Sequence, residues 1–204
     1  MLQQAFFQLA QNYSTDIPFI EKLWNEIEKN YSGKKRYYHN LTHLENMFAQ
    51  LQEVKNLADD WDMLMFALFY HDLIYKVPGK DNEEKSARTA NERLQQLGVP
   101  VERINRCCNH ILATKSHTAS NDPDTNLLTD ADLSILGQEP PVYIDYTKQI
   151  RKEYAFYPDI LYKPGRKKVV NHFLHMDRVF KTSIFFDKYE QQAKQNLTLE
   201  LEGA

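Results

Sequence analysis

The stretch MLMFALFYHD, residues 63–72, decides the fold of this 204-residue chain. Eight apolar residues run without interruption and are followed directly by His71 and Asp72. A run of this length is far short of the ~20 residues needed to cross a bilayer. A helix that is apolar nearly all round belongs inside a protein. We therefore predict a central helix from about Trp61 to Leu73, with the His-Asp pair at its end.

Helix start and stop signals surround this central segment. Proline or small polar residues precede apolar residues at helical spacing, and glycine often follows them. These signals predict further helices between residues 16 and 32, 40 and 54, 82 and 97, 100 and 115, 127 and 136, 140 and 156, 166 and 176, and 187 and 202. Residues 78–81 are predicted as a turn, and residues 116–126 as a polar loop.

The chain shows no pattern typical of strands or of separate domains. No segment alternates convincingly between polar and apolar residues, and no repeat, low-complexity tract or long linker interrupts it. The sequence therefore predicts an all-α fold, a single-domain helical bundle of roughly eight to ten helices over residues 1–204.

The composition argues against several classes of protein. The formal net charge is −3, so no basic surplus points to nucleic acid as the main partner. The only two cysteines, Cys107 and Cys108, are adjacent, and neighbours rarely form an unstrained disulfide, which fits a reducing cytoplasm. No basic segment precedes the apolar N-terminal residues, so we expect neither a signal peptide nor a membrane anchor. No pattern indicates the oligomeric state.

Two histidines lie four residues apart at a predicted helix start. In the segment YHNLTH, residues 38–43, Asn40 is a suitable cap, which puts His43 in the first turn and His39 just before it. Their Cβ atoms would lie ~6 Å apart in a regular helix, close enough to share one site. Taken alone, two ordinary surface histidines are the simpler interpretation.

Two further segments place polar groups beside apolar residues. His71 and Asp72 end the central helix, where burial costs free energy unless the groups are paired or bind metal. Asp130 and Asp132 lie among leucines and isoleucine, surroundings that aspartate usually avoids. The alternatives are a solvated or capping Asp72, and an N-cap Asp130 with Asp132 in the first helical turn.

Together His43, His71, Asp72 and Asp132 offer two imidazole nitrogens and two carboxylates from different helices. This donor set suits Mn, Fe, Ni, Zn or Mg, with water completing the coordination of one or two ions. It has no thiolates, unlike many structural zinc sites, so we expect open positions for water and substrate.

These residues resemble the HD superfamily of metal-dependent phosphohydrolases. The His-Asp pair that names the family matches His71-Asp72, its first histidine matches His43, and its last aspartate matches Asp132. The resemblance covers about residues 36–136 by motif, and helices over about 140–202 would pack on this core. Parts of the C-terminal region are similar to a small bacterial branch of predicted HD phosphohydrolases.

The resemblance implies a phosphomonoesterase or phosphodiesterase that acts on a nucleotide-like or other small phosphoester. Residues 38–43 and 131–134 are similar to segments of cyclic-nucleotide phosphodiesterases, in which the histidine matching His39 donates a proton to the leaving oxygen. Asp72 would hold or deprotonate the attacking water. The signature of cyclic-di-GMP phosphodiesterases and a clear purine clamp are missing, so a general nucleotide or phosphomonoester substrate is expected.

Several other residues are weaker candidates for a second metal or for the substrate. Each also has an ordinary structural explanation, such as an acidic first helical turn or a solvated basic face. The candidates are His110 and His117 for a second metal or phosphate, Glu83 or Glu84 for orienting water or a ligand, Lys115, Arg151 and Arg166 for phosphate, and Tyr38, Tyr70 and Tyr75 for stacking on a base.

Three other functions stay open at this point. A regulatory HD module could bind metal and nucleotide without turnover. A di-iron-type oxygenase could use a similar helical fold, but it would need His110 or His117 as additional ligands. A structural helical protein with incidental histidines is the third alternative.

Overall fold

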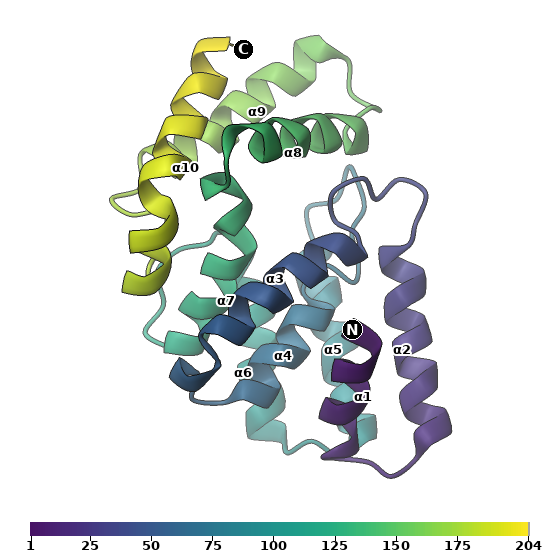
Figure 1. The fold of residues 1–204 in the computed structure, drawn as a ribbon. Helices are drawn as coiled ribbons and strands as arrows, with labels where there is room; N and C mark the ends of the chain where they lie inside the picture. Colours follow the sequence, from purple (N-terminus) through teal and green to yellow (C-terminus); the bar gives the residue numbers. More distant parts are fainter. Residues whose placement is uncertain (204) are drawn as a thin grey trace. The chain divides into compact units, whose positions relative to one another are not determined.

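The computed structural model describes residues 1–203, and every regular element within them is helical (Figure 1). The α-helices are α1 (Leu2–Gln11), α2 (Ile17–Tyr31), α3 (Leu41–Glu53), α4 (Trp61–Tyr70), α5 (Asn82–Leu97), α6 (Val101–Ala113), α7 (Pro123–Leu133), α8 (Pro140–Glu153), α9 (Asp159–Leu174) and α10 (Ser183–Gly203). Two short 3₁₀ segments are η1 (Lys55–Leu57) and η2 (Ser134–Gly137). The predicted all-α class is confirmed over the described residues.

The chain divides into two compact units. The first comprises Met1–Thr129, and the second begins at Asp130. Helix α7 starts in the first unit, and its residues from Asp130 onward belong to the second. That residues 1–204 form one domain, with the C-terminal helices packed on the core, stays a prediction.

Helix α4 lies at the centre of the first unit, in contact with α1, α3, α5 and α6 (Figure 1). Every residue of its apolar run, residues 63–70, is buried as the sequence predicts. Phe66 and Phe69 meet Phe6 of α1 edge-on, with ring centroids 6.3 and 5.2 Å apart. Burying one large apolar side chain contributes about 1.5–3 kcal/mol, so the other helices gain stability by covering α4.

Side-chain caps set the ends of the surrounding helices. The Asn40 carboxamide oxygen accepts hydrogen bonds from two backbone N–H groups, including that of His43, and starts α3 as predicted. Asp16 accepts a hydrogen bond from the N–H of Phe19 at the start of α2. Gly98 ends α5 with a φ of 83°, a left-handed conformation that glycine adopts without a steric penalty.

The predicted loop over residues 116–126 is too long. Helix α7 begins at Pro123, not at residue 127. The carboxylate of Asp122 accepts a hydrogen bond from the N–H of Asp124, which is the capping interaction of a helix start. As a result Asp130 and Asp132 lie near the end of α7, and the alternative that they cap and open their helix is wrong.

Three other helices also differ from the sequence prediction. Helix α9 begins at Asp159, not at residue 166, and continues through Pro164, although proline usually kinks or breaks a helix interior. Helix α10 begins at Ser183, not at residue 187, because Asp130 accepts hydrogen bonds from the N–H groups just before it. Helix α1 is an addition to the predicted set, because its N-terminal apolar residues carry no clear start signal.

Helix α10 packs against η2 and α9 in the second unit. The Asn196 side-chain amide donates hydrogen bonds to the carbonyl oxygens of Leu136 and Gln138, at 2.9 and 2.8 Å. Gly137 lies so close to Tyr189 of α10 that no side chain fits between them. A glycine in η2 is therefore a packing requirement of this unit.

The structure describes the state of the two cysteines and the apolar character of the helices. Cys107 and Cys108 are both free thiols. Across residues 1–203, no helix combines the length and the apolar character that crossing a bilayer requires. The cytoplasmic location stays a prediction.

We expect Gly137→Ala to destabilise the protein by about 1–3 kcal/mol, the usual cost of overpacking. The new Cβ would lie 2.5 Å from the Tyr189 Cβ and 2.6 Å from its carbonyl oxygen. Urea unfolding measures this change. Gly165→Ala is the matched control, because its Cβ meets nothing within 4 Å and alanine favours a helix over glycine by up to about 1 kcal/mol. Unchanged stability of Gly137→Ala would contradict the tight packing of η2 on α10.

Candidate metal centre

Two buried histidines bring their Nε2 atoms together at the centre of the first unit. His43 lies in the first turn of α3, where the Asn40 cap places it, and His71 is the residue that ends α4. Their exposed fractions are 3% and 1%. The two Nε2 atoms are 3.3 Å apart. The two residues that the sequence assigns to one site thus lie side by side, and their role as metal ligands stays a prediction.

A hydrogen bond determines which nitrogen of His71 can bind a cation. Its Nδ1 lies 2.9 Å from the carbonyl oxygen of Leu68. Because a carbonyl only accepts, Nδ1 carries the proton, and Nε2 presents its lone pair. Neighbouring ligands at ~2.1 Å from one ion lie roughly 3–3.4 Å apart, which fits the observed separation of the two Nε2 atoms.

Carboxylates complete the donor set. Within the first unit, His43 and His71 each offer one imidazole nitrogen, and the Asp72 Oδ2 lies 3.3 Å from the His71 Nε2. Asp132, the other predicted carboxylate ligand, lies on α7 among the residues of the second unit. Three of the four predicted ligands therefore lie together in the first unit, and the part of Asp132 stays a prediction. Nitrogen and carboxylate donors suit a divalent cation of borderline or hard character.

His39 lies beside this group without belonging to it. Its Nε2 is 3.9 Å from the Asp72 Oδ2, and its side chain is 18% exposed. Its ring stacks on that of Tyr75, with centroids 4.1 Å apart and an interplanar angle of 27°. The position just outside α3 agrees with the sequence prediction, and the stacking restricts how the imidazole can turn.

Arg36 joins the two loops that carry the candidate residues, and no sequence pattern pointed to it. Its guanidinium donates hydrogen bonds to the backbone carbonyl oxygens of His39, Asp72 and Leu73, at 3.0, 2.7 and 2.8 Å. It also lies over the ring of Tyr75, 5.4 Å from the centroid. Arg36 therefore ties the loop before α3 to the loop after α4, which is the arrangement that the candidate site requires.

A second group of His and Asp side chains could also hold a metal ion: His110, Asp122 and Asp124. His110 is fully buried, its Nδ1 is 2.7 Å from the Thr125 hydroxyl, and its Nε2 has no hydrogen-bond partner among the described residues. Burial lowers the pKa of this imidazole. The group lies apart from the predicted second metal position beside His43 and His71.

An arginine already provides the positive charge in this second group. The Arg106 guanidinium lies 2.9 Å from Asp122 and 3.1 Å from Asp124. Asp124 also accepts hydrogen bonds from the N–H groups of Asp59 and Asp60, each at 2.8 Å. These contacts link the start of α7 to the loop before α4, so we interpret the group as a structural network.

The other predicted substrate residues are engaged elsewhere or lie in other surroundings. Lys115 forms an ion pair with Glu84 and donates to the carbonyl of Lys80, and Glu83 lies with Glu84 in the acidic first turn of α5. His117 follows α6 and has a φ of 53°. Arg151 forms an ion pair with Asp159, and Arg166 forms one with Glu200.

Two interpretations of side chains near the candidate site need correction. Tyr70 is completely buried, so it is not available to stack on a ligand. Asp130 is buried too, and it accepts hydrogen bonds from the N–H groups of Lys181 and Thr182, just before α10. Burial lowers the pKa of the Lys181 ammonium, whose Nζ is 3.4 Å from Asp130. Asp130 thus stabilises the start of α10, where the helix dipole favours a negative charge.

We expect Arg36→Gln to weaken Mn²⁺ binding about tenfold or more, since groups that orient metal ligands typically matter by 10–100-fold. Loss of bonds to three carbonyls should also lower the free energy of unfolding by about 2–4 kcal/mol. Mn²⁺ titration and urea unfolding measure the two effects. Arg88→Gln is the control, because Arg88 is an exposed residue of α5. An unchanged Mn²⁺ affinity in Arg36→Gln would show that the loops hold their positions without it.

We expect His71→Ala to lose bound metal and Asp122→Asn to keep it. The first change removes one nitrogen of the His43–His71 pair, whereas the second alters a carboxylate that Arg106 already neutralises. Elemental analysis of both purified variants beside the unmodified protein tests the difference. Metal loss in Asp122→Asn alone would assign the ion to the second group.

Comparison with protein families, with curated proteins and with solved structures finds no match to this chain. The interpretation of the site therefore depends on its own geometry and on the resemblance of its residues to HD motifs.

Proposed function

We propose that this chain is an HD-type metal-dependent phosphohydrolase that acts on a nucleotide-like or other small phosphoester. One observation carries the proposal: the His43 and His71 Nε2 atoms lie 3.3 Å apart, and the Leu68 carbonyl holds His71 in the tautomer that binds metal. A buried imidazole pair of this kind suits a cation shared between them.

The residues that would hold the ion are His43, His71 and Asp72 of the first unit, and Asp132 is the further ligand that we propose. Mn, Fe, Ni, Zn or Mg all accept nitrogen and carboxylate donors, and Asp72 is the residue that could serve a second ion. A divalent ion bound here would polarise a phosphoryl oxygen and lower the pKa of a coordinated water to near neutrality.

Asp72 would orient the attacking water and take its proton. Its backbone is held from two sides, because its N–H donates to the Tyr31 hydroxyl and its carbonyl accepts from Arg36. Its side chain is 13% exposed, whereas His71 beside it is fully covered. The carboxylate therefore lies at the solvent side of the buried imidazoles, where water and substrate have access.

His39 would protonate the leaving oxygen. It lies on the same side as Asp72 but makes no part of the metal-ligand group. Its partial exposure lets the ring exchange protons with solvent, and the stacked Tyr75 limits its orientation. A positioned acid of this kind contributes typically about 10²–10⁴-fold to a rate.

The neighbouring tyrosines support an aromatic substrate group only in part. The ring of Tyr38 lies 4.9 Å from that of His43, and Tyr75 is stacked on His39. These two remain candidates for contact with a base, whereas buried Tyr70 does not. The proposed substrate is therefore a small phosphoester, and its nucleotide character depends on contacts of a base with Tyr38 or Tyr75.

The geometry favours turnover over a regulatory module and over a di-iron-type oxygenase. A regulatory module that only binds metal and nucleotide has no need of an imidazole beside Asp72, where His39 lies. A di-iron-type oxygenase would need His110 or His117 near His43, but His110 belongs to the group that Arg106 neutralises. Phosphoester hydrolysis uses the residues that do come together.

We expect His39→Ala to lower kcat for phosphoester hydrolysis by about 10²–10⁴-fold while leaving the metal content unchanged. Phosphate or nitrophenol release from p-nitrophenyl phosphate, its bis-ester and a set of nucleotides, with added Mn²⁺, measures turnover. His175→Ala is the matched control, since His175 is an exposed histidine whose ring bonds only the Asn171 carbonyl.

Two results would contradict the proposed function in different ways. Loss of metal from His39→Ala would remove the role of proton donor from this residue. Absence of metal from the unmodified protein, even after reconstitution with Mn²⁺ or Mg²⁺, would contradict the catalytic function as a whole.

A further inference from the structure

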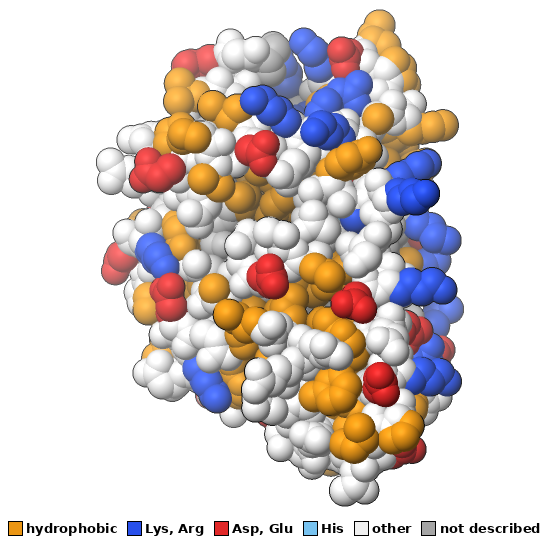
Figure 2. Space-filling model, turned by 45° about the vertical axis from the view of Figure 1, so that its right-hand side comes forward, with side chains coloured by type: hydrophobic (Ala, Val, Ile, Leu, Met, Phe, Trp, Pro, Cys, Tyr) orange, Lys and Arg blue, Asp and Glu red, His pale blue; other side chains and the backbone are white. Residues whose placement is uncertain are grey.

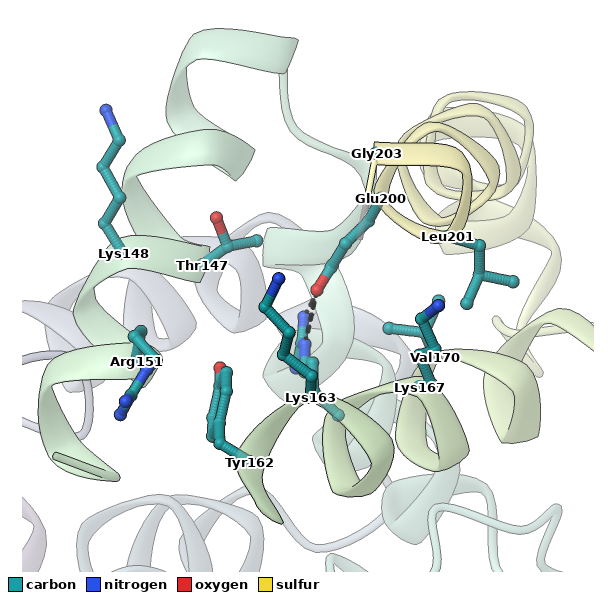
Figure 3. A pocket seen from close by; sticks show the side chains of 11 residues that line it. Thr147, Lys148, Arg151, Tyr162, Lys163, Lys167, Val170, Glu200, Leu201 and Gly203 are labelled. Atoms are coloured by element: carbon teal, nitrogen blue, oxygen red, sulfur yellow. Dashed lines mark hydrogen bonds and ion pairs between the residues drawn. The ribbon is translucent and has the colours of Figure 1, made fainter. Parts of the chain in front are cut away.

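The second unit contains a cavity that has no part in the proposed hydrolysis. It measures about 290 Å³ and lies between side chains of α8, α9 and α10 (Figure 3). Pockets that bind small molecules typically begin at roughly this size, about 300 Å³. Figure 2 shows several lysine and arginine side chains near the top of the drawn face and more along its right-hand edge.

The lining of this cavity is strongly positive. Its basic residues are Lys148, Arg151, Lys163, Arg166 and Lys167, and its one acidic residue is Glu200. Glu200 is bound by Arg166 through two hydrogen bonds of 2.7 and 3.0 Å, and it also accepts one from the Tyr143 hydroxyl. The carboxylate therefore compensates Arg166 and leaves the lysines of the lining without a compensating charge.

Three of the cations keep their charge available to a ligand. Arg151 is paired with Asp159, at 2.7 Å. The structure gives Lys148, Lys163 and Lys167 no side-chain partner among the described residues, and all three are exposed. In Figure 3 Lys163 extends toward the Glu200 carboxylate, whereas Lys148 points away from it. Lysines held around one space attract an anion more strongly than any of them does alone.

A rigid floor distinguishes the cavity from a patch of surface lysines. The side chain of Arg166 is only 12% exposed, and it is held between Glu200 and the Tyr146 hydroxyl. Its contacts account for three of the five guanidinium N–H groups, so two donors remain for an incoming oxygen. This arginine thus offers a fixed, directional donor beside the exposed lysines of the lining.

The walls add an apolar component. Tyr162, Val170 and Leu201 line the cavity, and the Arg151 guanidinium lies over the Tyr162 ring, 4.6 Å from its centroid. Burial raises the pKa of the Tyr162 phenol, so the residue stays a neutral hydrogen-bond donor in this positive surrounding. A ligand that fits both parts has a doubly charged end and a flat or apolar body.

We propose that this cavity binds an organic phosphate, with the phosphate among Lys163, Arg166 and Lys167 and the organic part against Tyr162. Two neighbouring lysine ammonium groups and a fixed guanidinium are donors that suit phosphate oxygens. The site shares no residue with the metal centre, so the proposal does not depend on the proposed hydrolysis.

Isothermal titration with phenylphosphonate tests the proposal, because its carbon–phosphorus bond resists a phosphoesterase. We expect saturable binding to the full-length protein with a Kd below about 1 mM at low salt. The double variant Lys163→Gln/Lys167→Gln should bind at least tenfold more weakly. Lys22→Gln/Lys29→Gln, which changes two lysines lining a groove on α2, is the matched control and should bind like the unmodified protein.

His71→Ala separates this cavity from the metal centre, because binding here should persist in that variant. Loss of binding in His71→Ala, or equal affinity in the double lysine variant, would overturn the proposal. No saturable binding to the unmodified protein would also overturn it. Equal affinity for inorganic phosphate would contradict the organic part of the ligand and its contact with Tyr162.

Discussion

The burial of α4 is the constraint on which the first unit depends. Its apolar residues cover every side of the helix, so α1, α3, α5 and α6 must surround it. Each large side chain contributes about 1.5–3 kcal/mol on burial, whereas one buried polar group left unsatisfied costs about 1–3 kcal/mol. The apolar residues together outweigh the cost of carrying His71 to a position that is only 1% exposed. The imidazole is brought to the candidate site by its neighbours, and the Leu68 carbonyl then satisfies one of its nitrogens.

Arg106 and Arg36 each connect separate segments of the first unit, but they bind different kinds of acceptor. Arg106 neutralises Asp122 and Asp124 directly, so the group around His110 holds two loops and a helix start in place. Arg36 instead binds the backbone carbonyls of the two loops that carry His39 and Asp72. The guanidinium binds backbone oxygens there, so its role is to position the two loops. The second unit repeats the first pattern, because Arg166 and Glu200 neutralise each other and leave only the lysines around them in excess.

Much of the local structure follows from short-range chemistry that a sequence displays. Asn40 caps α3 because its side chain reaches the next N–H groups, and Gly98 ends α5 because it tolerates a positive φ. The start of α7 at Pro123 also rests on local chemistry, because the Asp122 carboxylate accepts a hydrogen bond from the N–H of Asp124. The start of α10 is different, because the carboxylate of Asp130 meets the N–H groups of Lys181 and Thr182 only in three dimensions.

The sequence by itself determined the all-α class, the central place of α4 and the histidines that converge at its end. Periodicity and capping are local properties of a sequence, and a helix that is apolar all round is buried in the interior. Only the tertiary structure decided that Asp72 lies beside the ligand group, that His110 belongs to a network around Arg106, and that Arg166 pairs with Glu200. It also revealed Arg36, whose three acceptors come from two loops separated by more than thirty residues. Backbone carbonyls are present at every position, so no sequence pattern distinguishes the ones that a distant arginine will bind.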